Sequence, residues 1–274
     1  MQRNSREQGL SFHPEQERFA TRRMVVKIGS STITEDGNPL NAEFMEDIAD
    51  QVATLFRSGV EVLIVSSGAV DTGKALAEIN GENVDPLTRQ VAAIYGQVAV
   101  TSAWKDALMR HGILAGQALY TEDQLQEGGV SRVWDVLRAA LKIGVPIINT
   151  NDAASDFAVR KLNPTENDQL SSYIARKIEA DTLLLLTDRD GILDESGERI
   201  PYVSRTEDVE DVIGNQGNGT GGMRSKIYAA DGFRRREQSS RAIIANGRRK
   251  NVILDVARGR MDIGTLFGKP FMLY

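Results

Sequence analysis

The stretch that decides the fold is Met24-Val25-Val26-Lys27-Ile28-Gly29-Ser30-Ser31. A short apolar run that ends in glycine and serines predicts a buried strand whose carboxyl end opens into a tight loop rich in hydrogen-bond donors. Lys27 lies inside this strand, and a lysine is almost never buried without a partner. The stretch therefore predicts an anion, best a phosphate, at the end of a core strand. The alternative is an exposed edge strand with the Lys27 ammonium group in water.

The composition limits the kind of protein. A chain of 274 residues suits one large α/β domain or two small ones. Its formal charge of −5 and pI near 5.3 argue against general nucleic-acid binding, which needs a concentrated positive surface. The basic clusters at 234–236 and 248–250 are expected to be solvated helix and loop faces.

Residue counts also exclude several chemistries. The chain has no cysteine, which excludes disulfides, thiolate metal sites and a cysteine nucleophile. Two histidines, His13 and His111, leave little for a serine–histidine triad, and we predict no protein metal site. No apolar run reaches membrane-spanning length, and residues 1–23 are polar, so we expect a flexible arm on a cytoplasmic protein with no membrane contact.

Apolar periodicity predicts strands that alternate with helices. Strands are expected at 24–28, 60–65, 113–120, 145–148, 182–186 and 242–245, and helices at 41–57, 86–111, 130–143, 167–178 and from about Met223. Gly96 predicts a break or a close contact in its helix. Strand–helix–strand units imply right-handed parallel crossovers, whose ligands collect at the carboxyl ends of the strands. Ser67 and Gly68 are therefore expected at the same edge as Gly29.

Two familiar phosphate-binding signatures occur in misleading form. The segment from Gly68 to Lys74 nearly spells a Walker A loop, but Ala75 stands where the motif needs a hydroxyl group. The segment from Gly217 to Gly222 matches the spacing of a dinucleotide fingerprint but follows no convincing strand. Neither reading is adopted.

Six blocks at the predicted strand ends and helix starts form a more specific pattern. They are Val-Val-Lys-Ile-Gly-Ser-Ser at 25–31, Ile-Val-Ser-Ser-Gly-Ala at 64–69, Ile-Asn-Thr-Asn-Asp at 148–152, Asn-Asp-Gln-Leu-Ser at 167–171, Leu-Leu-Thr-Asp-Arg-Asp-Gly at 185–191 and Gly-Thr-Gly-Gly-Met-Arg-Ser-Lys at 219–226. In order and spacing they resemble the amino-acid kinase family, from about residue 24 to residue 267. The last block is the most specific, because its glycine loop places a lysine on the following helix.

This resemblance implies a three-layer αβα sandwich with a mainly parallel central sheet. Residues 24–274 would form one kinase domain after the arm at 1–23, with an acceptor-binding N-terminal half and an ATP-binding C-terminal half. The implied reaction moves the γ-phosphoryl group of ATP to the γ-carboxylate of L-glutamate, the first step of proline biosynthesis. Such a transfer needs alignment and charge neutralisation and no general base, because the carboxylate is already ionised.

The resemblance also implies roles for individual residues. Lys27 and Lys226 would clamp the transferring phosphoryl group, and Asp168 would hold both ammonium groups. Gly29, Ser30 and Gly68 would donate to phosphate oxygens, and Mg²⁺ would be carried by the nucleotide phosphates. The remaining implied residues are Ser67, Gly68, Asp152 and Asn167 for the amino-acid substrate, and Thr187, Asp188, Gly219, Thr220, Gly221, Gly222 and Met223 for ATP.

The chain departs from the family pattern on the acceptor side. Thr150 stands where the family usually has glutamate, and the segment 153–166 is longer than usual. Many relatives also carry a C-terminal PUA domain, and we expect none within residues 24–274. A sister kinase that acts on another carboxylate or a small phosphate therefore stays open as an alternative, and a catalytically silent nucleotide-binding protein is a second.

Partners follow from the resemblance alone. L-Proline is expected as a feedback inhibitor, and a reductase that forms glutamate-5-semialdehyde is expected to consume the reactive acyl phosphate. A homo-oligomer is also expected, with the helix at 91–108 as a candidate contact because it is apolar on more than one side.

Overall fold

A computed structural model describes residues 19–34, 38–81, 84–120, 132–154, 166–210, 221–234, 240–260 and 262–268. Residues 1–18 of the predicted arm lie outside this part of the chain. The folded part begins before the predicted boundary at residue 24, because the backbone N–H groups of Ala20 and Thr21 both donate to the carbonyl oxygen of Ala257. Phe19 also packs against the core.

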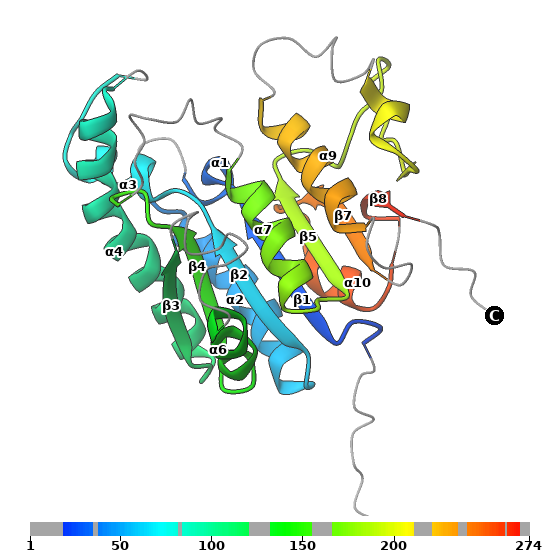
Figure 1. The fold of residues 1–274 in the computed structure, drawn as a ribbon, viewed down its shortest axis with the longest axis horizontal. Helices are drawn as coiled ribbons and strands as arrows, with labels where there is room; N and C mark the ends of the chain where they lie inside the picture. The colour runs from blue at the N-terminus through cyan, green and yellow to red at the C-terminus, as the bar shows by residue number, and fades with distance from the viewer. Residues whose placement is uncertain are drawn as a thin grey trace, which may run out of the picture.

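The centre of the molecule is one sheet with the strand order β3-β4-β2-β1-β5-β7-β8-β6 (Figure 1). Its strands are β1 (Arg23–Ile28), β2 (Glu61–Ser66), β3 (Ala115–Tyr120), β4 (Val145–Thr150), β5 (Thr182–Thr187), β6 (Tyr202–Val203), β7 (Arg241–Asn246) and β8 (Gly264–Phe267). The pairs are parallel except for β7 with β8. Because β1 lies between β2 and β5, the edge-strand alternative for Lys27 is excluded.

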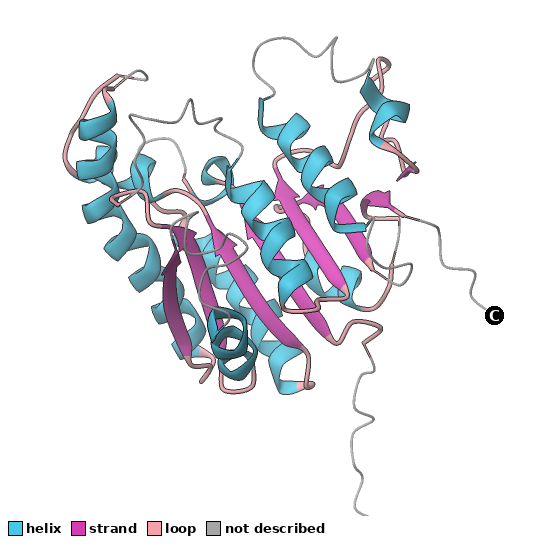
Figure 2. Cartoon of the chain, in the orientation of Figure 1, coloured by secondary structure: helices cyan, strands magenta, loops and turns pink. Residues whose placement is uncertain are grey.

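Helices cover both faces of the sheet (Figure 2). They are α1 (Ser30–Ile33), α2 (Ala42–Arg57), α3 (Ala69–Leu76), α4 (Pro86–Arg110), α6 (Arg132–Leu141), α7 (Glu166–Lys177), α9 (Gly221–Arg234) and α10 (Val252–Ala257), with a 3₁₀ helix η1 (Thr206–Val209). One apolar cluster joins α2, α4 and α10 to one face of the sheet, and a second joins α6, α7 and α9 to the other. The three-layer αβα sandwich with a mainly parallel sheet is confirmed.

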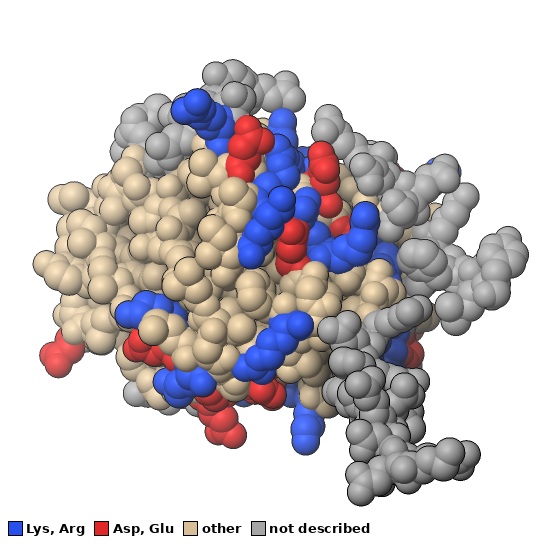
Figure 3. Space-filling model, turned by 90° about the horizontal axis from the view of Figure 1, so that it is seen from below, with Lys and Arg blue, Asp and Glu red and all other residues tan. Residues whose placement is uncertain are grey.

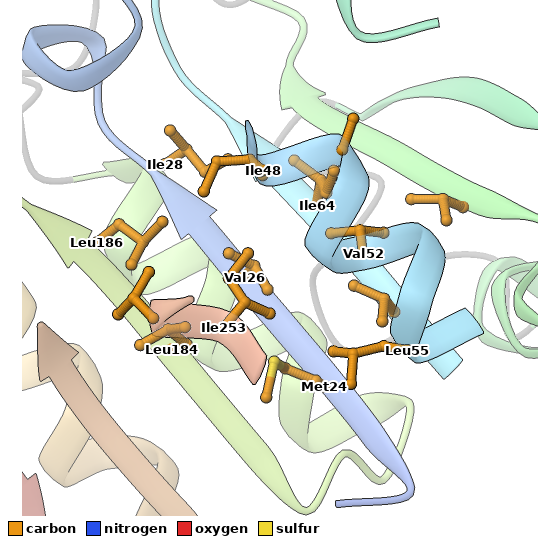
Figure 4. Packing of buried hydrophobic residues seen from close by; sticks show 14 of the residues in the cluster. Met24, Val26, Ile28, Ile48, Val52, Leu55, Ile64, Leu184, Leu186 and Ile253 are labelled. Atoms are coloured by element: carbon orange, nitrogen blue, oxygen red, sulfur yellow. The ribbon is translucent and has the colours of Figure 1, made fainter. Parts of the chain in front are cut away.

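Strand β1 shows how the sequence builds these layers. Met24, Val26 and Ile28 point to the α2 and α10 side, where they pack with residues such as Val52 and Ile253 (Figure 4). Residues of a strand alternate between its two faces, so Val25 and Lys27 point to the other side. The ammonium group of Lys27 is therefore directed toward the layer that contains α7 and α9.

Helix α2 follows the local signals of its sequence. The side chain of Asn41 accepts a hydrogen bond from the N–H of Phe44 at 2.9 Å, which caps the first turn. The helix ends at Arg57, close to the predicted boundary. The sequence did not predict three short elements in the last third of the chain, which are α10, β6 and β8.

Helices α3 and α4 touch through glycine. A Cβ atom at Gly73 would lie 1.8 Å from the carbonyl oxygen of Ala92, and one at Gly96 would lie 1.8 Å from that of Ala69. Side chains at these positions would force the helices apart. The prediction that Gly96 marks a break or a close contact is thus settled as a close contact.

The surface carries both signs of charge. On the face seen in Figure 3, lysine and arginine side chains lie beside aspartate and glutamate side chains. Helix α4 exposes several large apolar side chains, among them Leu87, Ile94, Tyr95 and Val98. Its role in an oligomer stays a prediction. Among the described residues, no helix combines the length and apolar character needed to cross a membrane.

Candidate active site

The carboxyl ends of β1, β2, β4 and β5 lie at one edge of the sheet, uppermost in Figure 1. A cavity of about 330 Å³ opens there. Its lining comes from the ends of β1, β2 and β4, from the first turns of α1, α3, α7 and α9, and from the second turn of α4. Lys226 lines it from one turn further along α9. Residues from distant parts of the sequence thus share one cavity, as the crossover topology predicts.

Two lysines share one aspartate at the floor of the cavity. The Nζ atom of Lys27 lies 2.7 Å from Oδ1 of Asp168, and that of Lys226 lies 3.4 Å from Oδ2 of the same carboxylate. The three side chains are 4% to 10% exposed. Two buried ammonium groups on one carboxylate leave a surplus positive charge that is costly unless an anion accompanies it.

The electrostatics of Lys27 reflect this surplus. Burial lowers the pKa of the Lys27 ammonium group, the charge of Asp168 opposes that effect, and the nearby charge of Lys226 lowers the pKa further. An incoming phosphate would restore the balance and favour the charged form of Lys27. The cluster is therefore arranged to receive an anion.

Glycine backbone approaches both ammonium groups. A Cβ atom at Gly29 would lie 3.6 Å from Nζ of Lys27, and one at Gly222 would lie 3.8 Å from Nζ of Lys226. Gly68 has a φ of +100°, and a Cβ atom there would lie 2.5 Å from a carbon of Ile33. The sequence predicts a loop after Gly29, but the structure has the short helix α1 there, which begins at Ser30. These glycines leave room for phosphate oxygens beside backbone donors.

The opposite end of the cavity is built around Asp152. The hydroxyl group of Thr150 donates to Oδ1 of Asp152 at 2.6 Å, and the N–H of Thr150 donates to the side chain of Asn149 at 2.9 Å. Burial raises the pKa of the Asp152 carboxyl, while the bond from Thr150 and the charge of Arg89 lower it. Thr150 thus orients a carboxylate that faces the cavity.

Asn167 connects this end to β2. Its side-chain NH₂ donates to the hydroxyl oxygen of Ser67 at 3.0 Å. Its Oδ1 atom is buried and accepts no hydrogen bond from the described residues. A buried acceptor beside a cavity indicates a ligand that supplies the missing donor.

The structure gathers most of the predicted site residues but not all. Lys27, Gly29, Ser30, Ser67, Gly68, Asp152, Asn167, Asp168, Gly222 and Lys226 line the cavity. Thr187, Asp188 and Met223 do not; the hydroxyl group of Thr187 donates to Asp188 at 3.1 Å, and Met223 packs on the core. Gly221 is the first residue of α9, and Gly219 and Thr220 lie outside the described residues. Their roles in binding ATP stay predictions.

The near-Walker segment is helical. Residues 69–76 form α3, and the Nζ atom of Lys74 donates to the carbonyl oxygen of Gly81 at 2.6 Å. Lys74 does not line the cavity. A phosphate-binding loop of the Walker type is therefore absent from this segment, as the alanine at position 75 suggests.

Several lining residues were not singled out from the sequence. They are Ala69, Val70, Asp71, Arg89, Gln90 and, as a binding residue, Thr150. Arg89 and Gln90 come from the second turn of α4. The apolar pattern of this helix does not tell where the helix lies relative to the cavity. An arginine near the start of a helix was the available signal, because a cation there opposes the helix dipole.

The described residues contain no group of three or more histidine, cysteine, aspartate or glutamate side chains suited to a metal ion. The carboxylates that line the cavity are Asp71, Asp152 and Asp168. The carboxylate of Asp168 is engaged by both lysines. The described residues therefore fit a cation that arrives with phosphate ligands better than one held by a protein cage.

Comparison with known proteins places this geometry in a family. Residues 22–246 match the family model described as Amino acid kinase family. Several relatives are named Glutamate 5-kinase. The one from Trichlorobacter lovleyi is 35% identical, and the match covers 90% of this chain and 67% of the relative. The one from Mycobacterium ulcerans is also 35% identical, and the match covers 79% of this chain and 61% of the relative. A third, from Rhodococcus opacus, is 37% identical over 76% of this chain and 58% of its own. The chain thus spans about three fifths to two thirds of the length of these relatives.

A solved structure with a similar fold agrees with this family assignment as far as the fold is concerned. The N-acetylglutamate synthase from Neisseria gonorrhoeae, solved with coenzyme A and N-acetyl-glutamate, matches 92% of this chain and 60% of its own with a TM-score of 0.66. At 17% identity this likeness concerns the fold alone. The family model and the relatives carry the assignment further, and the chain belongs to the amino acid kinase family.

Proposed function

We propose that the chain is a glutamate 5-kinase, which transfers the γ-phosphoryl group of ATP to the γ-carboxylate of L-glutamate. The observation that carries this proposal is the Lys27–Asp168–Lys226 cluster, with its surplus positive charge at the floor of a cavity. The relatives at 35–37% identity bear that name, which supports L-glutamate as the acceptor.

The chemistry suits the residues present. A carboxylate oxygen of the acceptor attacks the γ-phosphorus, a new P–O bond forms, and the bond to the β–γ bridging oxygen breaks to release ADP. No proton needs to be removed, because the carboxylate is ionised at neutral pH. Catalysis then depends on alignment and on positive charge around the migrating phosphoryl group.

The two lysines would supply that charge. Lys27 reaches the site from β1 and Lys226 from α9, so their ammonium groups approach from different elements. Preorganised donors of this kind contribute about 3–4 kcal/mol each to transition-state stabilisation. Asp168 would act as a positioning residue, because it holds both ammonium groups without needing to contact the phosphate.

Magnesium would be bound by the nucleotide phosphates, which supply the hard oxygen ligands that it prefers. It would neutralise phosphate charge alongside the lysines. Of the predicted nucleotide residues, Thr187 ends β5 beside β7 and Asp188 follows it, on the C-terminal half of the chain. They would contact the nucleotide away from the lined cavity.

The test is an assay of the purified chain with magnesium–ATP and a panel of acceptors. The panel contains L-glutamate, L-aspartate, N-acetyl-L-glutamate and inorganic phosphate, and both ADP release and hydroxylamine trapping of an acyl phosphate are measured. We expect hydroxamate formation with L-glutamate at the highest rate. ADP release without hydroxamate would indicate a phosphate acceptor or hydrolysis.

Other outcomes would replace the proposal. Turnover with another carboxylic acid and not with L-glutamate would assign a sister kinase. Tight binding of ATP without turnover on any acceptor would assign a silent nucleotide-binding protein. A Lys226→Met control, which removes one of the two ammonium groups, distinguishes turnover at this cavity from that of a contaminating kinase.

A further inference from the structure

A buried polar pair joins α4 to the carboxyl end of β2. The indole N–H of Trp104 donates to the hydroxyl oxygen of Ser66 at 2.9 Å, and the hydroxyl group of Ser66 donates to the carbonyl oxygen of Ser67 at 3.2 Å. Trp104 is fully buried, and Ser66 is 1% exposed. The pair thus reaches from the interior of the α4 layer to the segment where Ser67 and Gly68 line the cavity.

The chemistry of the two side chains fixes the direction of both hydrogen bonds. An indole N–H group can only donate, so the hydroxyl oxygen of Ser66 has to accept this bond. The hydroxyl hydrogen is then left for another acceptor, and the carbonyl oxygen of Ser67 lies within hydrogen-bond distance. Trp104 therefore determines where the hydroxyl group of Ser66 points.

Packing alone does not require polar groups at this place. Val62 and Ile64 of β2 belong to the same apolar cluster as Trp104, and Ser66 lies two residues beyond Ile64, so its side chain points to the same face. A hydroxyl group and an N–H group buried in an apolar layer cost free energy unless they are paired. An alanine opposite a phenylalanine would avoid this cost. The polar pair therefore indicates a role outside packing.

The bond to Ser67 constrains a peptide group at the cavity. This peptide is trans, so the carbonyl group of Ser67 and the N–H of Gly68 lie in one plane and point in opposite directions. The carbonyl oxygen accepts from Ser66, whereas the N–H of Gly68 makes no hydrogen bond to any residue that the structure describes. The N–H of Ser67 donates to the carbonyl oxygen of Ile28 at 3.0 Å, which ties the same segment to β1. Gly68 thus offers an oriented donor to a ligand in the cavity.

We propose that Ser66 is a positioning residue for phosphoryl transfer, held by Trp104 and acting through the carbonyl group of Ser67 on the N–H of Gly68. This N–H donates to an anionic oxygen of the reacting groups, in the cavity that also contains the lysine cluster. A donor that is aimed before the reaction begins stabilises the transition state without reorganisation. The inference rests on the proposed function for the identity of the reaction, but the orientation of the N–H group can be measured without turnover.

Four variants of the full chain separate positioning from stability. Ser66→Ala removes the hydroxyl group and leaves the N–H of Trp104 without its acceptor. The double variant Ser66→Ala/Trp104→Phe removes both polar groups, so that no buried donor is left unpaired. Ser66→Thr keeps a hydroxyl group at this position. Thr182→Val is the matched control, because it removes another buried strand hydroxyl group, which accepts from Arg241 at the amino end of β5.

We expect Ser66→Ala to lower kcat by about 10-fold and to keep the KM values for ATP and L-glutamate within about 2-fold, because the donor acts in the transition state. The double variant should regain the melting temperature of wild type and keep the low kcat, since its core is paired but Gly68 is not oriented. Ser66→Thr should stay within about 3-fold of wild type, because the hydroxyl group is retained. Thr182→Val should melt at a lower temperature with kcat unchanged.

The orientation of the Gly68 N–H is measured by the backbone amide resonance of Gly68 in the isotope-labelled chain. The probes are inorganic tripolyphosphate and magnesium with a non-hydrolysable ATP analogue, so no turnover is needed. A charge-assisted hydrogen bond to a phosphate oxygen shifts an amide proton downfield. We expect this shift in wild type and in Ser66→Thr, and a smaller one in Ser66→Ala and in the double variant.

Three results would each overturn the inference. The first is recovery of kcat together with stability in the double variant, the second is an equal loss of kcat in Thr182→Val, and the third is the absence of a Gly68 shift in wild type with both probes. Hydroxamate formation with L-glutamate is measured in parallel, so that the two proposals fail separately. A Gly68 shift that depends on Ser66 without turnover would refute the kinase proposal and keep the positioning of Gly68. Turnover that Ser66→Ala leaves unchanged would refute the positioning and keep the kinase.

Discussion

Cationic side chains are buried at both ends of the strands of the central sheet, which we call its carboxyl edge and its amino edge, but their surroundings differ. At the carboxyl edge, Lys27 and Lys226 share the carboxylate of Asp168 beside a cavity. At the amino edge, the guanidinium group of Arg241 donates to the hydroxyl oxygens of Thr21 at 3.0 Å and Thr182 at 3.4 Å. The first group keeps a surplus charge next to open space, and the second is enclosed by protein.

At the amino edge, hydrogen bonds connect Arg241 to Asp181 through Thr182. Thr182 donates to Oδ1 of Asp181 at 3.0 Å, and the backbone N–H groups of Arg22 and Arg23 donate to Oδ2 of the same carboxylate at 2.9 and 3.3 Å. Burial lowers the pKa of the Arg241 guanidinium group, and the charge of Asp181 opposes that effect. The comparison teaches that burial alone does not distinguish the two cation sites, whereas an unbalanced charge beside a cavity does, and we use the second feature to predict function.

The largest effect is expected from breaking the carboxyl-edge cluster. Lys226→Met should lower kcat by about 100- to 1,000-fold, because it removes a donor to the migrating phosphoryl group. The fold should remain, since Lys27 and Asp168 then form a neutral pair. Steady-state kinetics and thermal unfolding check both statements against the exposed control Lys142→Met. Normal turnover in the Lys226 variant would remove this residue from the mechanism.

The reverse is expected at the amino edge. Arg241→Met should lower the free energy of unfolding by about 2–3 kcal/mol, because it leaves the hydroxyl groups of Thr21 and Thr182 without their buried charged donor. The melting temperature should fall by roughly 5–10 °C. Below that temperature kcat should be unchanged. A loss of kcat with unchanged unfolding would show that the two edges are not functionally distinct.

The pH dependence of turnover sharpens the comparison. Because the pKa of Lys27 is below its ordinary value of 10.5, the ammonium group loses its proton earlier as the pH rises. The value of kcat/KM for ATP should therefore begin to decline with rising pH at a midpoint below 10.5. The midpoint for kcat should lie at a higher pH, because bound phosphates favour the charged form of Lys27. Return of samples to neutral pH controls for unfolding. A kcat/KM limb at or above 10.5 would contradict a pKa of Lys27 lowered by its burial and by the nearby charge of Lys226.

The smallest effect concerns the acceptor end. Thr150→Val removes the hydroxyl group that donates to Asp152, so KM for the acceptor should rise by about 3- to 10-fold. The KM for ATP should stay constant and serves as the internal control. An equal rise in both values would mean that Thr150 supports the whole cavity and not Asp152 in particular.

Much of this fold could be predicted from local sequence. The alternation of Met24, Val26 and Ile28 with Val25 and Lys27 already assigns β1 to the core and directs Lys27 to one layer. The glycines at 29 and 68 mark the strand ends where the cavity opens. An anion near Lys27 could be anticipated for the same reason, whereas the pairing of Lys27 with Lys226 followed from the resemblance to the amino-acid kinase family.

Other features depend on contacts that no single segment contains. Arg89 reaches the cavity only because α4 crosses α3 at a particular place, and this depends on the backbone contacts of Gly73 and Gly96. The strand β8 has four residues and pairs in the antiparallel sense, too short for its period to be recognised. Thr187 and Asp188 directly follow the strand predicted at 182–186, yet neither lines the cavity.

The glycine contact between α3 and α4 has a consequence for how substrate choice can change. These helices bring Gly68 and Arg89 to the acceptor end, and their separation is already at its minimum. Any replacement at Gly73 or Gly96 adds atoms and can only increase the separation. Substitutions at these two positions are therefore expected to widen this part of the cavity and not to narrow it.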